Sequence, residues 1–176
     1  MSFLARLRRL VKAPDAATES PAPIYLDLRD RVIHTAPGAV GIVPSAEAPN
    51  VWGVLFEVAL DKGSATIVAL ADGTTSLYTS GGGGTIGGGE HEHIATMSRK
   101  LVQLADAHFE AFPPAETLPL PTEGRSALVL LTYAGPRRVE DGSRTLAQGR
   151  GALSRVYMAA QDVLTHLRLE EESRRA

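Results

Sequence analysis

The chain has 176 residues, a mass of 18.7 kDa and a formal net charge of −2, with 44% hydrophobic and 22% charged residues. This length and composition suit one soluble globular domain with a short appendage, and they exclude two full enzyme domains. The charge argues against a general nucleic-acid binder, and the absence of cysteine excludes disulfides, thiolate nucleophiles and cysteine-bound metal centres.

Residues 2–12 place apolar side chains at helical spacing with four cations between them. This pattern predicts a short basic amphipathic helix, followed by a linker rich in proline and alanine that reaches residue 23. Such a helix can contact a membrane surface or a partner protein, or it can pack on its own domain. Because the cations interrupt the apolar residues, we expect no secretion signal and a cytoplasmic protein.

Residues 24–50 are expected to lead into the domain. They include a short helix over Ile24–His34, which ends before Pro37, and then an extended loop. The α+β domain itself is expected over residues 51–170, with residues 171–176 as a charged tail.

Three strands should open the domain, over residues 51–60, 65–71 and 74–80. The first strand alternates large apolar residues with smaller ones, which is typical of a strand with one buried face. Asp72 and Gly73 predict a two-residue hairpin of type I′ between the second and third strands. The three strands would therefore form an antiparallel meander.

The second half of the chain continues with a long amphipathic helix, a loop rich in proline, two strands and a last helix. Their ranges are residues 91–112, 113–124, 127–133, 137–140 and 153–169. The order β-β-β-α-β-(β)-α predicts an α+β fold in which both long helices pack on one face of an antiparallel sheet. Profilin-like and roadblock-like domains have this layout, and their other sheet face often meets a partner.

The runs VWGVLFEVAL, VALADGTTSLY and GGGEHE carry a more specific likeness. With these runs the core resembles a family of small bacterial proteins of unassigned function, over about residues 51–112. The resemblance implies a bacterial origin and no particular activity.

Seven of the 17 glycines lie in the segment Gly81–Gly89, between a strand and a helix start, where backbone amides attract anions. The spacing G-x-G-x-x-G is present, but it follows a hairpin strand, and Glu90 stands where a P-loop needs lysine. The segment is therefore either a tightly packed connection or a ligand site. The candidate ligand-binding residues are Gly82, Gly84, Thr85, Gly87, Gly88, Glu90, His91 and His93.

His91 and His93 also raise the question of a metal site. On a helix these two side chains would point about 200° apart. A shared ion would need an extended first turn and a third ligand from His34, His108 or His166. We therefore predict no metal site and no cofactor.

Charge is uneven along the chain: residues 45–123 carry a local −7, and residues 125–168 a local +4. Five arginines of the basic part either bind an acidic partner or phosphorylated ligand, or pair with the acidic half. They are Arg137, Arg138, Arg144, Arg150 and Arg155.

No complete catalytic set occurs in the sequence, since G-x-S-x-G is absent and Ser80 has no identifiable base. We therefore predict a non-catalytic protein-interaction or regulatory module whose partner is another protein or a second copy. The alternative is a small-molecule or anion-binding domain, with or without enzymatic activity, that uses Gly81–Gly89 and the following helix start. We expect no nucleic-acid partner, and a membrane-surface contact through residues 2–12 is a further option.

Overall fold

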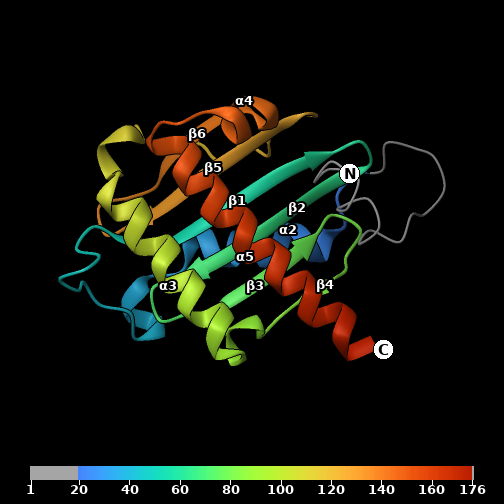
Figure 1. Cartoon of the computed structure of the whole chain (residues 1–176), viewed down its shortest axis with the longest axis horizontal. Coiled ribbons are helices and arrows are strands. Elements are labelled where there is room, and N and C mark those ends of the chain that lie inside the picture. The colour runs from blue at the N-terminus through green and yellow to red at the C-terminus, as the bar shows by residue number, and fades with distance from the viewer. Residues whose placement is uncertain (1–19, 176) are drawn as a thin grey trace.

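The computed structural model describes residues 20–175, and the helix predicted over residues 2–12 lies outside them. Six strands form one antiparallel sheet in the order β4-β3-β2-β1-β5-β6 (Figure 1). This sheet and its helices confirm the predicted α+β fold. The strands are β1 (Val51–Leu60), β2 (Gly63–Leu70), β3 (Thr75–Thr79), β4 (Gly84–Thr85), β5 (Arg125–Thr132) and β6 (Arg137–Gly142).

The helices are α2 (Pro23–His34), α3 (Glu92–Ala107), α4 (Ser143–Gln148) and α5 (Ala152–Arg175), with short 3₁₀ turns η1 (Pro37–Val40), η2 (Gly88–Glu90) and η3 (Phe109–Ala111). Helix α3 is shorter than predicted because η3 replaces its last turn. Helix α5 is longer, since it continues through the residues that we expected as a tail. Within residues 20–175, no helix is long and apolar enough to cross a membrane.

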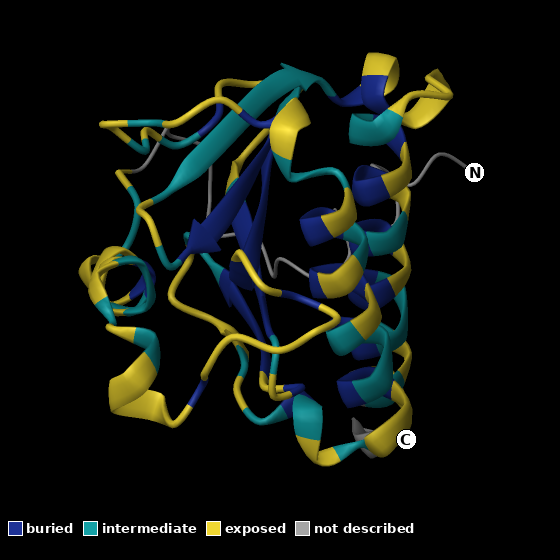
Figure 2. Cartoon of the chain, turned by 90° about the vertical axis from the view of Figure 1, so that its left-hand side faces the viewer, coloured by how far each residue is buried: buried dark blue, intermediate teal, exposed yellow. Residues whose placement is uncertain are grey.

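Helices α3 and α5 cover one face of the sheet, as predicted (Figures 1 and 2). Alternate residues of β1, including Val54, Phe56 and Val58, pack into the core on this side. Phe56 meets Tyr157 of α5 edge-on, with 5.3 Å between ring centroids. Aromatic pairs in this arrangement add to the stabilisation from burial alone.

The second face of the sheet is covered as well, by α2 and by the segment before β5 (Figure 2). Tyr25 of α2 packs there with Trp52 and Leu55 of β1, and Leu118 and Leu120 add contacts from the segment before β5. All ten residues of β1 are therefore buried, whereas the alternation in its sequence had predicted one buried face.

The turn between β2 and β3 also differs from the prediction. A type I′ turn needs positive φ at both central residues. Among the described residues only glycines have positive φ, so Asp72 does not. Four residues form the turn instead: Gly73 takes a φ of 95°, and the Asp72 carboxylate accepts a hydrogen bond of 2.8 Å from the Thr74 amide.

Candidate functional site

The glycine-rich segment is not a single loop. Gly82 lies in a tight turn after β3, where its amide donates to the carbonyl of Thr79 at 2.9 Å. Gly84 and Thr85 form the edge strand β4. The predicted ligand-binding residues that remain lie in or beside η2 and at the start of α3: Gly87, Gly88, Glu90, His91 and His93. The structure thus divides the candidates between a sheet edge and a helix start.

Close packing explains why two residues in the second half of the glycine-rich segment, Gly88 and Gly89, are glycines. A Cβ on Gly88 would lie 2.2 Å from Leu167 Cδ2 of α5, and one on Gly89 would lie 2.4 Å from the carbonyl oxygen of Gly73. The amides of Glu90 and His91 donate to carbonyls of Gly87 and Gly88 at 3.0 and 3.2 Å. This part of the segment therefore seats η2 against α5 and the β2–β3 turn, and ligand binding by it stays a prediction.

The first half of the segment lies at the surface, beside the start of α2. Ile24 Cγ2 is 3.5 Å from the position that a Cβ on Gly82 would take, and the Ala22 amide donates to the Ser80 carbonyl at 2.8 Å. Ile86 follows β4 directly and is 71% exposed, while Ile24 is 51% exposed. We call Ile24, Gly82, Gly84, Thr85 and Ile86 the β4 edge surface.

Two of the predicted residues, His91 and His93, turn toward one carboxylate on α5. His91 is extended and precedes α3, which is the geometry that lets both imidazoles face the same way. Their Nδ1 and Nε2 atoms lie 3.5 and 3.4 Å from the two Glu170 oxygens. The His93 ring is 6.0 Å from both the His91 and the His166 rings. We call His91, His93, His166 and Glu170 the imidazole cluster.

The imidazole cluster is not arranged as a metal site. No group of three or more His, Asp or Glu side chains within the described part of the chain is placed to hold an ion. His166 contacts the Asp162 carbonyl through Nδ1 at 2.9 Å. His34 lies on α2, and His108 follows the other end of α3. The N to O separations around Glu170 exceed those of a good hydrogen bond, so the contact gains most of its strength when the imidazoles are charged.

A second polar group lies between α2 and β1 and was not predicted from the sequence. Arg29 donates to both oxygens of Glu57, at 2.5 and 3.1 Å, and to the carbonyl of Leu118 at 2.7 Å. Tyr25 and Thr66 share a hydrogen bond of 2.8 Å beside them. Burial raises the pKa of Tyr25 to about 12. The sequence did contain a signal for this buried pair, because Glu57 is the one charged residue in the ten-residue strand β1.

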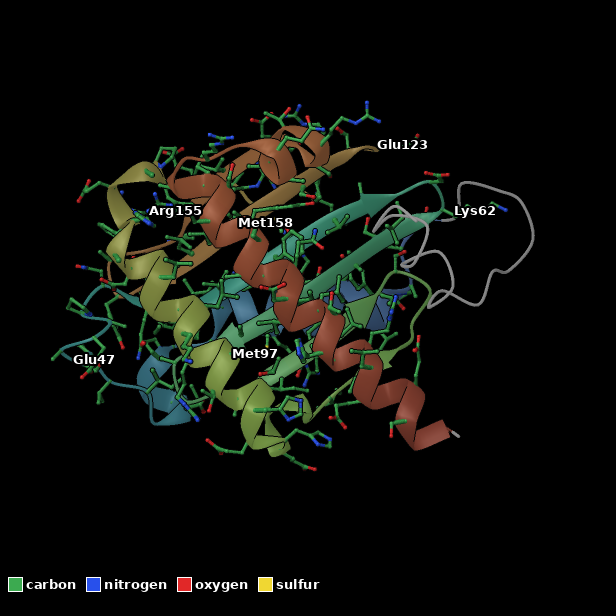
Figure 3. The ribbon with its side chains drawn as sticks, in the orientation of Figure 1. Glu47, Lys62, Met97, Glu123, Arg155 and Met158 are labelled. Carbon is green, nitrogen blue, oxygen red and sulfur yellow. The ribbon has the colours of Figure 1, made fainter. Side chains whose placement is uncertain are left out.

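The five arginines that we singled out separate into two kinds. Arg137 donates to the Phe112 carbonyl at 2.6 Å and lies over the Phe109 ring, and Arg138 bonds to Glu140. Burial alone would raise the pKa of Glu140, but hydrogen bonds from Arg138 and Arg125 outweigh it and lower the pKa. The other three are exposed, with Arg155 at the start of α5 (Figure 3): Arg144, Arg150 and Arg155.

No protein-family model, curated protein sequence or solved structure matches this chain. The resemblance of its core to a bacterial family therefore stays a prediction.

Proposed function

We propose that this chain is a non-catalytic protein-interaction module that associates with a second copy of itself through the β4 edge surface. The observation that carries the proposal is the exposure of Ile86, 71%, directly after an edge strand. A second exposed isoleucine, Ile24, lies beside Gly82 in the turn that leads into the same strand. Full burial of one isoleucine side chain stabilises by roughly 1.5–3 kcal/mol, so an interface here would gain apolar contact from each copy.

The two edges of the sheet differ in a way that favours the β4 side. At the other edge, Arg138 and Pro113 form a backbone hydrogen bond, and Pro114 bridges to Arg137, so part of β6 is already covered. β6 also carries charged side chains, which discourage strand addition. Gly84 gives β4 little side-chain cover, and the outer backbone groups of this short strand can accept another strand.

The chemistry of this surface suits an identical partner. No charged residue lies between Asp72 and Glu90 in the sequence. A two-fold interface brings the same patch of both copies together, so the uncharged segment that contains β4 and Ile86 can meet its own copy without charge repulsion within that segment. Two apolar edges of this kind therefore complement each other.

Sedimentation velocity of the full chain over a wide range of concentration tests the proposal. We expect reversible association of the natural protein, weakened about tenfold or more by Ile86→Ser, since loss of one apolar anchor of about 1.4 kcal/mol has that effect. Val43→Ser is the matched control. Val43 is 70% exposed and belongs to the loop between η1 and β1, on the opposite side of the view from β4 (Figure 1). A protein that stays monomeric at every concentration refutes the proposal, as does equal weakening by both substitutions.

A further inference from the structure

The end of α5 runs beyond the hydrophobic core. Leu167, whose Cδ2 packs over Gly88, is the last buried residue of α5 among those described. Leu169, two residues later, is 49% exposed. Apolar burial therefore contributes little to the last turns of this helix, and polar contacts decide how firmly they are held.

Among the described side chains, those of the imidazole cluster make a polar contact between the end of α5 and the start of α3. Glu170 lies between His91 and His93, with one carboxylate oxygen near each ring. A neutral imidazole at 3.4–3.5 Å offers a weak hydrogen bond, whereas an imidazolium adds a charge-assisted interaction. Histidine side chains in proteins commonly change charge between about pH 5 and 8.

The charged groups around the cluster are predominantly acidic. Two carboxylates already have cationic partners: Glu92 with Arg99 at 2.5 Å, and Glu172 with Arg168 at 3.4 Å. Asp72 accepts hydrogen bonds from Thr74. The described charged side chains on η2, α3, α5 and the β2–β3 turn near the cluster are Asp72, Glu90, Glu92, Arg99, Lys100, Asp162, Arg168, Glu170 and Glu172. Among these described side chains, carboxylates outnumber cations by six to three.

We propose that the imidazole cluster acts as a pH-dependent clasp. When His91 and His93 take up protons, both bind Glu170 more strongly and hold the end of α5 against the start of α3. Because an imidazolium and a carboxylate are both charged on the acidic side of neutrality, we expect the clasp to tighten as the pH falls from 8 toward 5. Protonation of His166 would oppose the clasp, because it would place a third cation with its ring centroid 6.0 Å from that of His93. The device is separate from the self-association proposed above, which involves no titratable group.

Hydrogen exchange on the full chain tests the clasp, read as amide protection factors, which correct for the intrinsic effect of pH. For residues 168–173 and 90–93 we expect protection to rise about 1.5- to 5-fold when the pH falls from 8 to 6, the range for an exposed ion pair. Glu170→Gln should remove this rise. Glu172→Gln is the matched control, because it removes a carboxylate of the same helix end that pairs with Arg168 instead.

The double variant His91→Gln/His93→Gln should behave like Glu170→Gln. Protection that does not depend on pH in the natural protein overturns the clasp. So does a pH dependence that persists in Glu170→Gln, since the carboxylate would then not be the partner. Because both comparisons use changes with pH within each variant, a general loss of stability in one variant does not imitate either result.

Discussion

Replacement of Arg29 by methionine is the most demanding test of how α2 is held on the sheet. The Arg29 guanidinium provides two of the three hydrogen bonds to Glu57, whose side chain is fully buried in the central strand β1. Methionine keeps the apolar part of the side chain and removes the charge and the donors. The carboxylate would then keep one donor, the Thr66 hydroxyl at 3.3 Å.

The expected loss is large because the remaining charge stays buried. Removing one partner of a buried ion pair costs about 3–5 kcal/mol, which is a substantial part of the roughly 5–15 kcal/mol that stabilises a typical domain. The Leu118 carbonyl also loses its 2.7 Å donor. The double variant Arg29→Met/Glu57→Leu replaces both charges by apolar groups, and we expect its stability to return to within about 2 kcal/mol of the natural protein.

Urea unfolding followed by Trp52 fluorescence is the assay. Trp52 is the single tryptophan and is buried in the same cluster as Tyr25 of α2, so it reports on this face of the sheet. Far-UV circular dichroism, recorded on the same samples, follows the whole fold. The reasoning is refuted if Arg29→Met lowers the unfolding free energy by less than about 1 kcal/mol, or if the double variant is no more stable than the single one.

Two further predictions concern Tyr25 and the glycine-rich segment. Since the folded pKa of Tyr25, about 12, lies above its ordinary value of 10.0, its contribution to stability is complete below pH 10 and is lost as the pH rises through 12. Urea unfolding at rising pH should show a loss of up to about 2–3 kcal/mol that Tyr25→Phe lacks, and identical pH profiles would contradict this. Gly89→Ala should cost about 1–3 kcal/mol, because its Cβ would meet the Gly73 backbone. Gly81→Ala, which points into open space, should lie within about 1 kcal/mol of the natural protein, and equal urea midpoints for the two variants would argue against the packing explanation.

The parts of the fold that were predictable from the sequence are those with a local pattern. The bounds of β1 and the existence of α3 and α5 follow from apolar residues at periods of two and 3.6, which each segment shows by itself. The two-residue strand β4 is too short to carry a period, and it forms only because β3 lies alongside it. The sheet order likewise depends on strands that meet far apart in the sequence.

The layer formed by α2 was not predictable for a different physical reason. The buried residues of α2 are Tyr25 and Arg29, one helical turn apart. Tyr25 shares an apolar side of the helix with Leu28 and Val32, but nothing in the local pattern marks the charged Arg29 as buried. Their partners, Thr66 and Glu57, are 41 and 28 residues away. A buried charge makes sense only beside its counter-charge, and single-sequence periodicity does not reveal which segments meet.

The imidazole cluster shows the same limit at the candidate site. His91 and His93 could be singled out by their composition and position, but Glu170 and His166 lie on a helix more than seventy residues later. Their meeting depends on how α5 crosses α3, with Leu167 seated on Gly88. Gly88, one of the glycines that suggested a ligand loop, therefore lets α5 pack closely against the start of α3.

The proposed self-association and the proposed clasp use different parts of the short segment between β3 and α3, so substitutions can separate them. Ile86 belongs to the β4 edge surface and His91 to the imidazole cluster, with the tightly packed residues of η2 between them. Ile86→Ser should weaken association and leave the pH dependence of α5 protection intact, whereas Glu170→Gln should do the reverse. Gly89→Ala displaces the segment that connects both sites, so it should disturb association and protection together. If Gly89→Ala changed one property and not the other, η2 would not be the common support of the two sites.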